Sequence, residues 1–291
     1  MIKVNHEAPM YHMNMLKQHN DYDFCLPHLL DESKKYEEFF LKSRNEGRYI
    51  VMDNSLHELG EPYDTERLLY WLKELSPDEF ILPDEWENST KTLVNAKWWI
   101  GILKNVYRGD KVGVVQALTY PEVITTYRNL KDLGCDKIAF SYGSSLYINI
   151  YNDPNNEGIK NQIEEELLSE LPTVDRINTN SLKKAVGRCI MMYKLHKNGI
   201  IKDNDRVHLL GTASPVEFIY HKRFAFIESI DTSNPVMNGL ELKIYPTRTS
   251  LDTKPLVNLN KAFHNKSFDS KTTNLVRHNV IIFKKFVNKI F

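Results

Sequence analysis

The chain of 291 residues has 38 basic and 38 acidic side chains, so its formal net charge is zero, and 42% of its residues are hydrophobic. These values are typical of a globular protein that forms one large barrel or two smaller domains. No stretch approaches the ~18 apolar residues of a membrane span. The first residues, MIKVNHEAPMYHMNM, lack the apolar core of a secretory signal. We therefore expect a cytoplasmic protein that is not bound to a membrane.

The three cysteines, Cys25, Cys135 and Cys189, are far apart in the chain and odd in number. This pattern argues against a disulfide framework and against a Cys-x-x-Cys metal site. Histidine and methionine are frequent in the first 28 residues, but their irregular spacing favours a mobile or packed N-terminal segment over a soft-metal site.

The charge is unevenly distributed along the chain. Residues 254–291 contain eight Lys or Arg against the single acid Asp269, a balance of +7, which leaves −7 for residues 1–253. A basic C-terminal arm is typical of nucleic-acid contact, and a solvated lysine-rich helix face is the alternative interpretation.

Short β-branched apolar runs alternate with longer segments of helical spacing. Such alternation predicts parallel strands joined by right-handed crossovers, and eight runs favour a (β/α)8 TIM-like barrel of the α/β class over an open sheet. No Gly-x-Gly-x-x-Gly loop follows the first run, which counts against a dinucleotide-binding fold. We expect the barrel to span residues 1–253 and a basic helical extension, 254–291, to pack on it. The predicted strands are 22–27, 49–53, 79–84, 111–116, 137–143, 206–211, 224–231 and 242–246.

Capping signals support the helices between these runs. Asp64 or Thr65 can cap a helix over 65–75, while Gly134 and Gly199 are suited to end two others. Pro215 suits the first turn of a short helix. The predicted helices span about residues 33–44, 65–75, 88–107, 120–134, 180–199 and 214–222.

Polar residues stand at the carboxyl ends of several predicted strands, which is where barrels of this kind carry their chemistry. A single strand-end aspartate is usually a turn former, and Thr232 to Pro235 indeed supply a turn after Asp231. Four strand ends carrying Asp or Gln indicate a site instead. The strand-end residues are Asp53, Asp84, Gln116, Ser141, Tyr142, Gly143, Gly211 and Asp231.

The residue types at these ends restrict the chemistry. No nucleophile elbow, strand-end lysine or strand-end histidine ligand set is present, which disfavours a serine hydrolase, a Schiff-base aldolase and a metal-dependent amidohydrolase. Carboxylate chemistry remains, in which one Asp acts as nucleophile and a second as general acid or base. The other polar groups can hydrogen-bond a heterocycle such as a purine.

The ordered series VMDNS (51–55), LPDE (82–85), VVQ (114–116), KIAFSYG (137–143), HLLGTASP (208–215) and ESIDTSNP (228–235) resembles the motifs of the tRNA-guanine transglycosylase superfamily. It is most similar to the phage and bacterial members that insert 7-deazaguanines into DNA. The resemblance covers about residues 49–240. A phage-encoded member would work in the host cytoplasm.

The resemblance implies that Asp231 is the nucleophile, which attacks C1′ of the target guanosine and holds the nucleic acid covalently. Asp53 would be the general acid/base that handles the proton of the departing or incoming base. No cofactor is implied. The segment from His208 to Gly211 would lead into the sugar or phosphate region.

The same resemblance implies which residues hold the base. Asp84 and Gln116 would face its Watson–Crick side, and Tyr142 or Phe140 could stack on it, although we expect Phe140 to pack in the core. The implied base-binding residues are Asp84, Gln116, Ser141, Tyr142, Gly143 and Gly211.

The chain also departs from the family pattern. No cysteine follows Asp231, so the usual zinc site is missing and we expect no metal, while Ala117 and Leu118 stand where the tRNA enzymes have glycines. We expect an enzyme that replaces guanine in DNA with a preQ0-like 7-deazaguanine. The alternatives are the same exchange in tRNA, a nucleic-acid N-glycosidase, and a non-catalytic barrel that binds nucleic acid. The adjacent Trp98 and Trp99 indicate either core packing or a subunit contact. In the second case we expect a homodimer.

Overall fold

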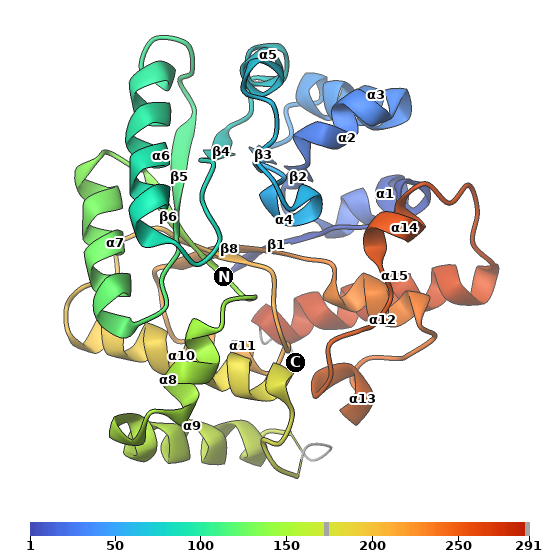
Figure 1. The fold of residues 1–291 in the computed structure, drawn as a ribbon. Helices are drawn as coiled ribbons and strands as arrows, with labels where there is room; N and C mark the ends of the chain where they lie inside the picture. The colour runs from blue at the N-terminus through green and yellow to red at the C-terminus, as the bar shows by residue number, and fades with distance from the viewer. Residues whose placement is uncertain (172–174, 289–291) are drawn as a thin grey trace.

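Eight parallel strands form a nearly closed barrel that helices surround (Figure 1). The structure is a computed structural model and describes residues 1–171 and 175–288. Around the sheet the strands follow the order β1-β8-β7-β6-β5-β4-β3-β2, which confirms the expected α/β TIM-like barrel. The strands are β1 Lys3–His6, β2 Asp23–Cys25, β3 Ile50–Met52, β4 Glu79–Ile81, β5 Asp110–Val115, β6 Lys137–Ser141, β7 Val207–Leu210 and β8 Ile227–Thr232.

The seam of the barrel lies between β1 and β2, the two ends of the strand order. The backbone N–H of Asp21 donates to the Val4 carbonyl at 2.9 Å. The Asn5 side-chain amide donates to the Tyr22 carbonyl at 2.7 Å. These bonds hold the two edges together where the regular ladder stops.

Seven of the predicted strands are present, and the prediction of a strand at 242–246 is wrong. Leu242 has a φ of 58°, and the side chains of Leu242 and Ile244 are 52% and 47% exposed, so this segment is a surface turn. The eighth strand is β1, in which Val4 is fully buried and pairs with Ile230 of β8. Periodicity missed β1 because four residues with one buried aliphatic side chain give little local signal.

Helices cover the outside of the barrel and bury their apolar stripes against it (Figure 1). In α5, for example, Leu68, Trp71, Leu72 and Leu75 are all buried. The longer helices are α3 Lys34–Asn45, α5 Thr65–Leu75, α6 Ser89–Leu103, α7 Tyr120–Asp132, α9 Glu157–Ser169, α10 Asn180–Lys197 and α15 Ser270–Asn288. The shorter ones are α1 Met10–Leu16, α2 Pro27–Glu32, α4 Leu56–Leu59, α8 Leu146–Asn152, α11 Glu217–His221, α12 Asn234–Leu240, α13 Arg248–Leu251 and α14 Leu259–Phe263.

The capping signals predicted for α5, α7 and α10 act as expected. Asp64 accepts a hydrogen bond from the Arg67 N–H at 2.8 Å and so caps α5. Gly134 and Gly199 have φ of 95° and 67° and follow the ends of α7 and α10. Pro215, expected in the first turn of a helix, instead lies in the turn before α11, which begins at Glu217.

The basic C-terminal segment packs closely on the barrel through α15. This helix lies against α12, α1 and α11, and its Val276, Val280 and Phe283 side chains are fully buried. Lys284 pairs with Asp21 at 2.6 Å next to the barrel seam. The domain boundary expected between residues 253 and 254 stays a prediction. The buried apolar side chains of α15 belong partly to the main hydrophobic core and partly to a second, smaller hydrophobic cluster.

Candidate active site

A cavity of about 800 Å³ opens at the carboxyl ends of the strands, and all eight predicted strand-end residues line it. Asp53, Asp84 and Asp231 come from β3, β4 and β8, which are far apart in the sequence but face one barrel mouth. Phe140, in contrast, is 1% exposed and packs beside Tyr127 in the core. Closure of the parallel barrel therefore brings the predicted site residues together.

Asp231 is held from below by a histidine inside the barrel. His208 Nε2 lies 2.9 Å from Asp231 Oδ1, and its Nδ1 lies 2.9 Å from the Ser229 hydroxyl. Ser229 and Asp231 are two residues apart in β8 and so point to the same face of the strand. Burial, reinforced by the Lys137 ammonium, lowers the pKa of His208 to about 3. The neutral imidazole can therefore donate from Nε2 to the carboxylate while Nδ1 accepts from Ser229.

Besides Asp84, four carboxyl groups line this mouth: Asp231, Asp53, Glu7 and Glu58. Burial raises the pKa of Asp231 to about 6, and Glu7, which shares a hydrogen bond with Asp231, opposes part of that rise. The pKa of Glu58 rises to about 8, chiefly through burial and then through Glu7. The pKa values of Asp53 and Glu7 lie well above their usual range because both groups are buried beside other acids. Burial among other acids therefore raises the pKa of all four groups.

A polar arrangement on the β4 and β5 side is suited to a heterocycle edge. Gln116 Nε2 donates to Asp84 Oδ2 at 2.6 Å, and Asn54 Nδ2 donates to Asp84 Oδ1 at 2.9 Å. The backbone N–H of Glu87 fixes the Gln116 side chain by donating to its Oε1 at 3.0 Å. The Asp84 carboxyl therefore stays oriented, with lone pairs left to accept from a ligand.

Aromatic rings stand at the rim of the cavity. Trp86 is 45% exposed, and the His57 ring lies 6.2 Å from both the Trp86 and the Tyr142 rings, measured between centroids. A Cβ at Gly143 would come within 2.6 Å of the Trp86 ring, and Gly211, with φ of 63°, faces Tyr142 in the same way. Both glycines keep space for these rings, which are the type of side chain on which a base stacks.

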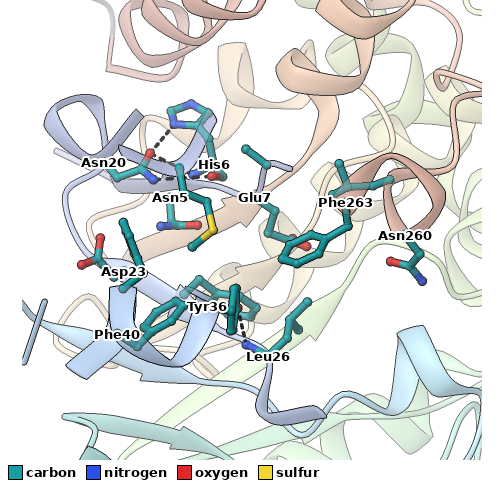
Figure 2. A pocket seen from close by; sticks show the side chains of 15 residues that line it. Asn5, His6, Glu7, Asn20, Asp23, Leu26, Tyr36, Phe40, Asn260 and Phe263 are labelled. Carbon is teal, nitrogen blue, oxygen red and sulfur yellow. Dashed lines mark hydrogen bonds between the residues drawn. The ribbon is translucent and has the colours of Figure 1, made fainter. Parts of the chain in front are cut away.

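A second cavity of about 40 Å³ lies beside the seam (Figure 2). It shares Glu7, Phe24, Leu259 and Asn260 with the main cavity. Glu7 follows β1, and its backbone N–H donates to the Thr232 carbonyl at 3.1 Å. Figure 2 shows the Glu7 side chain beside Phe263 of α14, with the Asn20–His6 pair on the other side. The space is large enough for water. Glu7 therefore lies where this small cavity adjoins the mouth.

Sequence reasoning missed several of these side chains. Glu7 was missed with its strand β1, and the role of His208 was missed because a histidine inside a strand gives no local sign of its partner. Glu58, in the short helix α4 that follows the Asp53 motif, lines the cavity as well. The tryptophan in LPDEW was the available signal for Trp86, since it follows directly on the Asp84 motif.

The N-terminal histidines and methionines are packed and dispersed. His6 bonds Asn20, His12 contacts Thr273, and His28 bonds Ser55. Among the side chains that the structure describes, no three His, Cys, Asp or Glu residues are placed to hold a metal ion. No helix within the described ranges is long and apolar enough to cross a membrane.

Comparison of this chain with known protein-family models and with curated proteins found no match. We therefore infer the function from the geometry and chemistry of the barrel mouth.

Proposed function

We propose that this protein is a transglycosylase that exchanges guanine in DNA for a 7-deazaguanine through a covalent bond to Asp231. The observation that carries the proposal is the meeting of two buried carboxyl groups, Asp231 and Asp53, in one cavity, where His208 orients Asp231. Burial raises the pKa of Asp231 to about 6, and burial together with Glu58 holds the pKa of Asp53 well above its usual range. One group is suited to attack and the other to protonate a leaving base.

The reaction has two balanced halves. In the first, Asp231 bonds to C1′ as the C1′–N9 bond of guanine breaks, and Asp53 gives its proton to the departing base. In the second, the incoming 7-deazaguanine loses its N9 proton to Asp53 and attacks C1′, which frees Asp231. The adjacent carboxylate also stabilises the positive charge that develops on the sugar.

The polar side of the mouth supports a guanine-like base. Guanine and its 7-deaza analogues present N1–H and N2–H donors, which match the free lone pairs of the Asp84 carboxylate. Gln116 keeps one amide hydrogen for the ligand after bonding Asp84. Trp86 and Tyr142 are available for stacking, and a cavity of about 800 Å³ is large enough for a flipped-out nucleotide.

The test follows a label and a covalent adduct in parallel. The protein is incubated with DNA or tRNA and labelled guanine or 7-deazaguanine, and each mixture is then denatured and separated. We expect label in DNA and a denaturant-stable protein–DNA adduct. Asp231→Asn should lose both, whereas Asp132→Asn, an exposed change on α7, should keep both. Entry of label into tRNA alone, base release without uptake, or an adduct that persists in Asp231→Asn would contradict the proposal.

A further inference from the structure

Two lysine ammonium groups converge on one short loop at the rim of the mouth. Lys184 of α10 donates from Nζ to the Gly143 carbonyl at 2.6 Å. Lys254 donates to the Tyr142 hydroxyl, and its Nζ lies 4.4 Å from the centre of the Tyr142 ring. Tyr142 and Gly143 are consecutive, so the two cations are anchored side by side on the loop that follows β6.

Neither lysine has an acid within salt-bridge distance among the residues that the structure describes. Glu87, the acid on this part of the rim, accepts hydrogen bonds from the Ser145 N–H at 2.7 Å and its hydroxyl at 2.6 Å. Lysines elsewhere in the barrel do pair with acids, as Lys131 does with Asp205 at 3.0 Å. The rim cations are instead bound to uncharged oxygens.

Placing two like charges together has an energetic cost. Burial lowers the pKa of Lys184, the charge of Lys254 lowers it further, and the Glu87 carboxylate opposes part of this change. Glu87 does not form a salt bridge with either lysine, so the repulsion between the two cations is relieved further when an anion binds them both. The two lysines are thus arranged for a shared anionic ligand.

Their position indicates which anion. Lys254 lines the same cavity as Asp231, and Gly143, the partner of Lys184, lines it too. A nucleotide whose base and C1′ enter the mouth must leave its flanking phosphates at the rim. The acids inside would repel a polyanion if they were all ionised, so cations at the entrance offset that repulsion where the strand arrives.

We propose that Lys184 and Lys254 form a phosphate site that holds a backbone phosphodiester next to the target nucleotide. This inference rests on the proposed function, because it assigns a role to the rim of the same site. The shared ligand chemistry is a phosphate oxygen, which a strand or a free nucleotide could provide, and we assign it to the strand.

The test measures equilibrium binding of a guanine-containing oligonucleotide in the Asp231→Asn background, which cannot form the covalent bond. Lys184→Met/Lys254→Met keeps the aliphatic stems and removes both charges. We expect it to weaken binding about tenfold at low salt and to reduce the slope of log affinity against log salt by about 1. Lys35→Met/Lys97→Met, two exposed lysines on α3 and α6, is the matched control and should leave both quantities unchanged.

A neutral methylphosphonate linkage beside the target guanine identifies the phosphate. This linkage should weaken binding by the protein that keeps both lysines, and it should have little further effect on the double methionine variant. Lys184→Arg/Lys254→Arg, which keeps both charges, should again be sensitive to the linkage. Equal sensitivity in the parent and the methionine variant would overturn the inference, as would loss of guanosine monophosphate binding with unchanged oligonucleotide binding. Thermal melting of each variant checks that it is folded.

The two proposals fail in different ways. If the protein with native Asp231 forms an adduct while the methionine variant keeps the salt slope and the methylphosphonate response, only the phosphate site is wrong. If the native protein forms no adduct and exchanges no base, the proposed function is wrong.

Discussion

At the scale of single residues, the proposed chemistry depends on what surrounds the Asp231 carboxyl. Burial raises its pKa to about 6, while Glu7 and His208 supply hydrogen bonds that favour the ionised form. His208 is itself kept neutral by burial and by Lys137, so it acts as an oriented donor. We infer that His208 positions the nucleophile, because it hydrogen-bonds both Asp231 and Ser229 but does not itself line the cavity.

A pH profile tests this role of His208. The exchange rate should rise as the pH increases through about 6, because Asp231 must lose its proton before it attacks. His208→Leu removes a donor to the carboxylate, so it should move this acid limb to higher pH and lower kcat/KM by roughly tenfold to a hundredfold. His208→Gln, which keeps a donor, should lie closer to the parent protein. Superimposable acid limbs in all three proteins would show that His208 is only structural.

At the scale of elements, α15 shows how a basic segment can also be a structural one. Its apolar stripe of Val276, Val280 and Phe283 is fully buried, while Arg277 and Lys285 face outward. Phe283 packs edge-on against Phe218 of α11 and against His6 of β1. The helix therefore supports the strand that carries Glu7 to the site.

Truncation of this stripe should destabilise the whole barrel. Phe283→Ala removes a fully buried ring, and such changes lower the free energy of unfolding by about 3–5 kcal/mol. Lys285→Ala on the exposed face of the same helix should change it by less than about 0.5 kcal/mol. Denaturant unfolding monitored by tryptophan fluorescence measures both. A Phe283→Ala protein as stable as the parent would mean that α15 is a dispensable arm.

At the scale of the whole molecule, the buried acids of the mouth lower the stability of the folded state. Asp231 is 5% exposed, and Asp53 and Glu7 share its surroundings. A carboxyl group whose pKa is raised on folding destabilises the folded state once the pH exceeds its ordinary value, because the unfolded chain ionises more readily. The acids that would perform the exchange are therefore a burden on the fold near neutral pH.

Neutralising the nucleophile should stabilise the protein in a pH-dependent way. A rise in the pKa of Asp231 from 3.8 to about 6 corresponds to about 3 kcal/mol. Asp231→Asn should give little or no gain below pH 4, a growing gain between pH 4 and 6, and a constant gain above that. Unfolding free energies at pH 4 and pH 8, with Asp132→Asn as control, measure the difference. A gain that is equal at both pH values would contradict the raised pKa.

Local signals in the sequence determined most of the architecture and the positions of the candidate site. Seven strands can be recognised as apolar runs that end in a turn. The ends of such runs carry the candidate site residues Asp53, Asp84, Gln116 and Asp231. Hydrophobic periodicity and turn chemistry act within a few residues, so both can be read without the fold. The same reasoning failed at 242–246, where an alternating pattern has no neighbouring strand to pair with.

Only the tertiary structure decided what surrounds those residues. Barrel closure selects β1 as the eighth strand and brings Glu7 beside Asp231 from the other end of the chain. It also places His208 beside the Asp231 carboxylate and brings Lys184 and Lys254 to the same loop at the rim. Long-range pairing, burial and the pKa shifts that follow from burial depend on which segments meet in space, and no short stretch of sequence contains that information.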